Sequence, residues 1–122
     1  MSDWYERMIP ETVDLHGPGI YVWEIEGAGI YVGKARRLSR RLRAYPRSVK
    51  NIQQHRPYRK SDPDGFREVH RALAAACAEG RKVTLRIAEV CAETDLNVRE
   101  AYWIGEIGTL NRTLARGVAE PT

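Results

Sequence analysis

Two copies of the sequence Gly-Ile-Tyr-Val place Tyr21 and Tyr31 ten residues apart in the first third of this chain. Lys34 follows the second copy closely, and Arg41 comes seven residues after Lys34. Arginine and lysine are donors for phosphate oxygens, and a phenol beside a cation can position or activate a water molecule. If the fold brings both tyrosines to one place, these four residues indicate chemistry on a phosphate group.

Positive charge is concentrated in the same part of the chain. No Asp or Glu occurs between Gly27 and Ser61, although the 122 residues as a whole contain 20 Lys and Arg against 16 Asp and Glu. Such a segment is typical of a protein that binds a polyanion, most often nucleic acid, while a solvated basic helix without a ligand is the simpler alternative. We expect nucleic-acid contacts from Arg36, Arg37, Arg40, Arg43, Arg47, Lys50, Arg56, Arg59 and Lys60.

Length and composition indicate a single domain over residues 1–122, large enough for a modest core. The two cysteines, Cys77 and Cys91, show neither a disulfide pattern nor the spacing of zinc ligands. The sequence has no apolar run that could span a membrane and no signal peptide, so we expect a soluble, cytoplasmic protein without membrane contact.

The duplicated segment reads as a β-hairpin, because two runs of β-branched and aromatic residues flank a Gly-containing connection. Tyr21 and Tyr31 share one face of an antiparallel pair only if the loop has an odd number of residues. We predict a three-residue loop over residues 27–29, with Glu26 opposite Ile30 and Gly29 in the left-handed conformation.

The remaining elements follow from periodicity. A helix is expected from residue 34 or shortly after it to Tyr45, where Pro46 ends it, followed by an exposed basic loop over residues 46–65. A second helix (66–80), a half-buried strand (82–90) and a last helix from Thr94 or Asp95 to Gly108 complete the pattern. This order predicts an α+β fold, with a small three-stranded antiparallel sheet flanked by helices.

Several of these residues resemble the GIY-YIG nuclease superfamily. The segments Gly19-Ile20-Tyr21 and Tyr31-Val32-Gly33 are similar to its two-part signature, and IYVGKARRLSRRLRAY resembles the N-terminal nuclease domain of the bacterial excision-repair incision subunit. The sequence REAYWIGEIGTLNR is similar to the metal-binding helix of the superfamily and its trailing asparagine. The resemblance covers residues 18–112 and leaves residues 1–17 as an N-terminal extension.

The resemblance implies a metal-dependent endonuclease that hydrolyses DNA phosphodiester bonds, in double-stranded or branched DNA, with Mg²⁺ or Mn²⁺ as cofactor. Glu100 would be the single metal-binding carboxylate, which suits Mg²⁺ because this ion commonly binds through one or two carboxylates. A bidentate phosphate contact suits Arg41. The catalytic residues implied are Tyr21, Tyr31, Lys34, Arg41, Tyr45, Glu100 and Asn111.

Simpler interpretations exist for single residues. Tyr45 is equally well the last core contact of its helix, Asn111 a helix-end cap, and Glu100 a solvated acid for which Glu93 or Glu106 could substitute. Two other functions also remain open, namely an inactive nucleic-acid-binding module of the same fold and an interaction subunit of a larger complex. Besides DNA, we expect as partner either a second copy of the chain, in a homodimer, or a protein that supplies DNA specificity.

Overall fold

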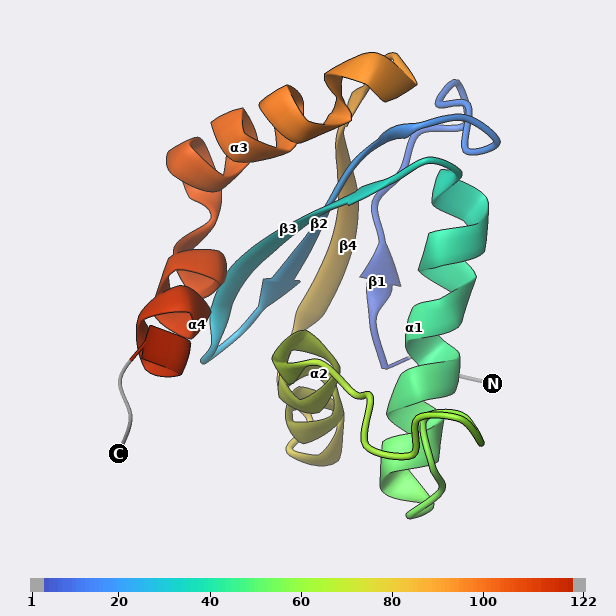
Figure 1. Ribbon diagram of the computed structural model, residues 1–122, viewed down its shortest axis with the longest axis vertical. Helices are drawn as coiled ribbons and strands as arrows, with labels where there is room; N and C mark the ends of the chain where they lie inside the picture. The colour runs from blue at the N-terminus through green and yellow to red at the C-terminus, as the bar shows by residue number, and fades with distance from the viewer. Residues whose placement is uncertain (1–3, 120–122) are drawn as a thin grey trace.

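The computed structural model describes residues 4–119, and the side chains of residues 4–114. Along the chain (Figure 1), the elements are β1 (Glu6–Arg7), β2 (Gly19–Ile25), β3 (Gly29–Ala35), α1 (Leu38–Gln53), α2 (Glu68–Ala78), β4 (Val83–Val90), a short 3₁₀ helix η1 (Glu93–Asp95), α3 (Leu96–Ile107) and α4 (Thr109–Ala119). The α+β class that the sequence predicts is confirmed.

The sheet has four strands in the order β1-β4-β2-β3, and β1 is parallel to β4. The prediction of three antiparallel strands is therefore wrong in detail. The extra strand comes from the N-terminal extension, where Arg7 pairs with Leu85 and the Met8 amide donates a hydrogen bond of 2.9 Å to the Leu85 carbonyl. A strand of two residues is too short for a periodic pattern, so no pattern in the sequence indicates β1.

Helices cover both faces of the sheet (Figure 1). On one face, Ile20, Val22 and Val32 form a buried cluster with Leu96 of α3. On the other face, α1 and α2 pack against a larger cluster that contains Tyr21 and the other core residues of β2. Among the described helices, none is long and apolar enough to cross a lipid bilayer.

Strand β4 does not show the burial that its alternating sequence predicts. Val83, Thr84 and Leu85 are consecutive and all buried, whereas a half-buried strand would expose Thr84. The first half of β4 is therefore enclosed on both faces. The alternation in the sequence predicts one face exposed to solvent, but other parts of the fold cover that face.

The β2–β3 hairpin has the predicted loop length but a different register. Ile25 lies opposite Gly29, so the loop consists of residues 26–28 and not residues 27–29. Gly29 does adopt a positive φ, of 128°, and Gly27 adopts a φ of 85°. Because the loop still has three residues, the side chains of Tyr21 and Tyr31 emerge on the same face of the sheet, as predicted.

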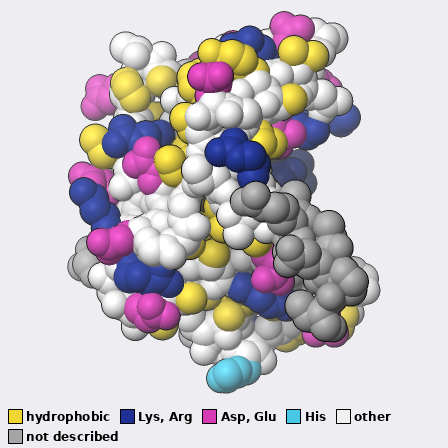
Figure 2. All heavy atoms as spheres, turned by 90° about the vertical axis from the view of Figure 1, so that its left-hand side faces the viewer, with side chains coloured by type: hydrophobic (Ala, Val, Ile, Leu, Met, Phe, Trp, Pro, Cys, Tyr) yellow, Lys and Arg dark blue, Asp and Glu magenta, His cyan; other side chains and the backbone are white. Residues whose placement is uncertain are grey.

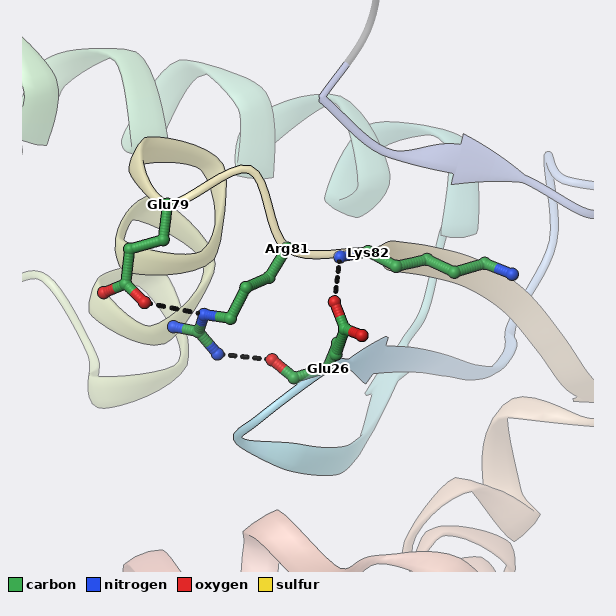
Figure 3. A network of polar contacts seen from close by, with 4 residues as sticks. All are labelled: Glu26, Glu79, Arg81 and Lys82. Carbon is green, nitrogen blue, oxygen red and sulfur yellow. Dashed lines mark hydrogen bonds and ion pairs between the residues drawn. The ribbon is translucent and has the colours of Figure 1, made fainter.

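Polar contacts join this hairpin to the segment that leads into β4 (Figure 3). Arg81 donates hydrogen bonds to the backbone carbonyl of Glu26 and, at 2.9 Å, to the carboxylate of Glu79. The Glu26 carboxylate accepts a hydrogen bond of 2.9 Å from the backbone amide of Lys82. The hairpin loop is thus held to the end of α2 by one arginine.

Helix α1 continues two turns beyond the predicted end, because Pro46 lies inside it. Proline removes one helical hydrogen bond, but the apolar face persists, and Val49 beyond the proline is fully buried. The helix ends at a Schellman motif, in which His55 has a φ of 57° and the Arg56 amide donates to the Asn51 carbonyl at 2.8 Å. The predicted loop over residues 46–65 therefore begins only after residue 53.

Helix α4, which the sequence analysis did not predict, lies along the outer edge of β3. The Asn111 amide group bonds the backbone of Val32 twice, accepting from its N–H at 2.7 Å and donating to its carbonyl at 2.9 Å. The Thr109 hydroxyl accepts a hydrogen bond of 2.9 Å from the Ile30 amide. Side chains of α4 thus satisfy backbone groups of β3 that no neighbouring strand reaches.

Gly19 and Gly33, the first and last residues of the two-part signature, are required by close packing. A Cβ atom at Gly33 would lie 2.3 Å from the ring of Tyr21, its partner across the strand pair. A Cβ atom at Gly19 would lie 2.7 Å from both the Glu89 carbonyl oxygen and the Leu38 side chain. Glycine at these positions allows an aromatic ring and a helix to approach the strands closely.

We predict that Gly33→Ala lowers the free energy of unfolding by about 1–3 kcal/mol, because the added methyl group overlaps the Tyr21 ring. Gly105→Ala is the matched control, since it lies inside α3 with no atom near its Cβ position, and should stabilise the protein by about 0.5–1 kcal/mol. Urea denaturation of both variants measures the difference. Equal stabilities of the Gly33 variant and the wild-type protein would contradict this packing.

Candidate active site

A cleft of about 960 Å³, which we call the first cleft, opens between α1, the hairpin strands and the start of α3. It brings together six of the seven predicted catalytic residues, all except Asn111. Asn111 instead contacts the edge of β3 from α4. The polar and charged residues that line the first cleft are Tyr21, Tyr31, Lys34, Arg36, Arg37, Arg40, Arg41, Tyr45, Ser48, Tyr58, Arg59, Arg67, His70, Glu93, Asn97 and Glu100.

Tyr21 and Tyr45 form the buried base of the first cleft. Their hydroxyl oxygens are 2.5 Å apart, and their rings pack edge to face with centroids 5.6 Å apart. Both side chains are almost completely buried. Tyr45 is therefore a core contact of α1 and at the same time a hydrogen-bond partner of Tyr21. The interpretation of Tyr45 as a core residue is thus compatible with its interpretation as a residue of the site.

Arg67 also reaches this phenol pair, and the sequence analysis did not single it out. The residue precedes the first turn of α2, and its guanidinium donates a hydrogen bond of 3.1 Å to the Tyr45 hydroxyl. His70, one turn later, packs against the Tyr45 ring with centroids 5.3 Å apart. Nothing in the local sequence FREVHRAL separates Arg67 from an ordinary surface arginine, because its partner is 22 residues away.

Lys34 and Glu100 meet at the opposite wall. The Lys34 ammonium lies 3.6 Å from the Glu100 carboxylate and also donates a hydrogen bond to the side-chain oxygen of Asn97. Asn97 and Glu100 are three residues apart on α3 and therefore lie on the same helix face. Asn97 could have been found from this spacing once Glu100 was suspected.

The cations of the first cleft outnumber its acids. Seven Lys and Arg residues line it against two carboxylates, those of Glu93 and Glu100. Glu93 is paired with Arg36 at 3.2 Å, whereas Arg41 makes no ion pair within the described part of the chain. By contrast, acidic and basic side chains are interspersed on the face that carries α3 and α4 (Figure 2).

The predicted nucleic-acid-binding residues do not all lie at the first cleft. Arg36, Arg37, Arg40 and Arg59 line it. Arg43 and Arg47 lie on a different flank of α1, beside the N-terminal segment. The three remaining cations line neither of these two surfaces, and they are Lys50, Arg56 and Lys60.

Burial raises the pKa of two phenols of the first cleft, those of Tyr31 and Tyr45. The pKa of Tyr31 is raised above its usual value by burial and by the nearby Tyr21, and the cations Arg67 and Arg41 offset this only in part. Burial likewise raises the pKa of Tyr45 well above 10, with Tyr21 adding to the effect. The cations thus act in the direction that would favour ionisation, but burial outweighs them, so the hydroxyls of Tyr31 and Tyr45 act as hydrogen-bonding groups near neutral pH.

The donor set fits a hard divalent cation that keeps most of its own ligands. No group of three His, Cys, Asp or Glu side chains that could hold a metal occurs among the described residues. Glu100 is half-buried at the wall of the first cleft and supplies one carboxylate, with the Asn97 amide oxygen close by. Mg²⁺ binds in this way, through one or two carboxylates together with water and phosphate oxygens.

Comparison of the chain with protein-family models, with curated proteins and with solved structures found no significant match in any of the three.

His70 gives the protein a testable pH dependence. Burial, with the charges of Arg67, Arg41 and Arg71 adding to it, lowers the pKa of His70 from 6.5 to about 4. Between these values the unfolded chain binds a proton that folded His70 does not, so the free energy of unfolding falls as the pH drops. This loss is complete only once the pH has fallen below about 4, where folded His70 is protonated as well.

We predict that His70→Asn reduces the decline in the free energy of unfolding between pH 6.5 and about pH 4. Asparagine can still accept the hydrogen bond of 3.0 Å that the Arg67 amide donates to the His70 ring. Urea titrations over this pH range measure the effect, with His16→Asn at an exposed position as the control. A decline as steep as that of the wild-type protein would exclude His70 as its source.

Proposed function

We propose that the protein is a metal-dependent endonuclease of the GIY-YIG superfamily that hydrolyses phosphodiester bonds in DNA. The supporting observation is the convergence of Tyr21, Tyr31, Lys34, Arg41, Tyr45 and Glu100 in one basic cleft. These residues come from β2, β3, α1 and α3, so they are close together in space although up to 79 positions apart in the sequence.

In this proposal the phosphate enters the first cleft between Arg41 and Lys34. Arg41 has no acidic partner among the residues that the structure describes, so its guanidinium is free to donate two parallel hydrogen bonds to phosphate oxygens. Lys34 adds a point charge from the opposite wall, where it now contacts Glu100. Both cations would stabilise the extra negative charge of the transition state more than that of the bound substrate.

Tyr31 is the residue that would orient the attacking water. Its side chain is only partly buried and lies on the same sheet face as Tyr21, whereas Tyr21 and Tyr45 are hydrogen-bonded to each other at the base of the cleft. Because its pKa is raised, the Tyr31 hydroxyl holds a water by hydrogen bonding and is not ionised at rest. Tyr21 and Tyr45 would fix the position of the Tyr31 ring and of the phosphate.

Glu100 would hold the divalent cation, with the Asn97 oxygen beside it. When bound, Mg²⁺ or Mn²⁺ supplies positive charge that offsets the negative charge developing on the phosphate and on the leaving oxygen. Metal binding requires the Glu100 carboxylate to give up its ion pair with Lys34 in favour of the metal. This ion pair is 3.6 Å long and partly exposed to solvent. Such an exposed ion pair contributes little free energy and is readily exchanged.

We predict that Glu100→Gln abolishes Mg²⁺-dependent nicking of supercoiled plasmid but leaves DNA binding nearly unchanged, because the carboxylate acts through the metal. Glu93→Gln is the matched control, since it removes the other carboxylate of the same cleft and should retain activity. Chelation of the metal should stop nicking by the wild-type protein. Nicking by the Glu100 variant at the wild-type rate would refute the proposed metal site, and DNA binding without any nicking by the wild-type protein would indicate a binding module.

Arg41 gives a second contrast with a residue on the same helix. We predict that Arg41→Ala lowers the single-turnover cleavage rate at saturating DNA by about 10²-fold or more, as for loss of a donor to the transition state. Arg43→Ala, which does not line the first cleft, should leave this rate unchanged. Similar losses in both variants would point to a diffuse basic surface without a dedicated arginine.

A further inference from the structure

A second basic surface lies on the other flank of α1. This second cleft has a volume of about 560 Å³ and is bounded by the N-terminal segment on one side and by α1 on the other. Its lining residues are Tyr5, Arg7, Leu15, His16, Arg37, Ser39, Leu42, Arg43, Pro46 and Arg47. Arg37 lines both clefts, so helix α1 forms the ridge between them.

The wall opposite α1 is fixed in place by backbone hydrogen bonds. The Leu38 amide donates to the Gly17 carbonyl at 3.0 Å, and the Ser39 amide donates to the Leu15 carbonyl at 2.7 Å. These bonds satisfy amides of the first turn of α1, so the N-terminal segment and α1 are held together at one end of the second cleft. Strand β1, which carries Arg7, anchors the same segment to β4.

Within the described part of the chain, the arginines of the second cleft have no acidic partners. None of the described Asp or Glu residues lines it, although four arginines do. The side chains of Arg7, Arg37, Arg43 and Arg47 are exposed, and none of the ion pairs in the described part of the chain involves them. The nearby carboxylate of Asp14 instead accepts a hydrogen bond from the His16 amide at 2.9 Å.

Three arginines outside the two clefts are paired with acids instead. Arg81, Arg86 and Arg99 each contact a carboxylate, at 2.9, 3.1 and 2.7 Å. Converging arginines without acids repel one another and favour a bound polyanion, and the guanidinium group is suited to phosphate. The contrast indicates that the second cleft receives anionic groups from another molecule.

We infer that the second cleft binds a run of backbone phosphates of the same nucleic acid whose scissile phosphate enters the first cleft. This inference rests on the proposed function for the identity of the polyanion. Helix α1 would then lie under the nucleic-acid backbone, with Arg37 at the crossing point and Arg43 and Arg47 holding phosphates away from the site of cleavage. These two arginines contribute to affinity and to the position of the substrate, and not to the chemical step.

The test uses the full chain, a fluorescently labelled DNA duplex and a titration of binding against salt. The double variant Arg43→Gln/Arg47→Gln should reduce the slope of log K against log salt by about 2 units, since each neutralised phosphate contributes about 0.9. Lys50→Gln/Arg56→Gln is the matched control, because it removes the same number of positive charges from exposed residues that line neither cleft. The slope measured for this control variant should change by much less. Circular dichroism checks that both variants are folded.

The outcomes separate this inference from the proposed function. A reduced slope for the Arg43 and Arg47 variant, with an unchanged cleavage rate at saturating DNA, supports the second cleft. The same reduced slope in a wild-type protein that never nicks DNA supports the second cleft and refutes the nuclease. The inference would be overturned by equal slope changes in both double variants, by an unchanged slope in the Arg43 and Arg47 variant, or by no DNA binding by the wild-type protein. Either of the last two results would indicate that the partner of the second cleft is an acidic protein surface.

Discussion

The packing of Tyr21 across Gly33 is the contact on which the candidate site depends. The ring fills the space that a side chain at position 33 would occupy, and its hydroxyl bonds Tyr45 at 2.5 Å. Tyr45 in turn accepts a hydrogen bond from Arg67. One aromatic ring thus connects β2, β3 and α1 directly and α2 through its partner, so the geometry of the first cleft and the stability of the core rest on the same atoms.

Local patterns in the sequence predicted the hairpin geometry, which depends on strand alternation and loop length. The shared face of Tyr21 and Tyr31 follows from a period of two and an odd loop length, and it holds although the loop lies one residue earlier than expected. The end of α1 was misplaced, because Pro46 was given more weight than the apolar residues that follow it. Burial of Val49 and of part of Ile52 compensates for the hydrogen bond that proline cannot make.

Long-range contacts explain what the sequence did not predict. Arg67 and Asn111 acquire their roles from partners 22 and 79 residues away, and no spacing rule connects such positions. Six of the seven candidate catalytic residues nevertheless line one cleft, and they were selected by resemblance to a motif and not by periodicity. Asn111 does not line the first cleft, because its side-chain amide is hydrogen-bonded to the backbone of β3.

The hydrogen bonds from α4 to β3 also bear on how the protein behaves at high concentration. One edge of the sheet is β1, which has two residues, and the other is β3, which has seven. A long uncovered edge is a template on which the strand of another molecule can pair, which leads to aggregation. Asn111 bonds both backbone groups of Val32, and Thr109 bonds the N–H of Ile30, which are groups that such a strand would use. Helix α4 therefore opposes pairing of this edge with another molecule.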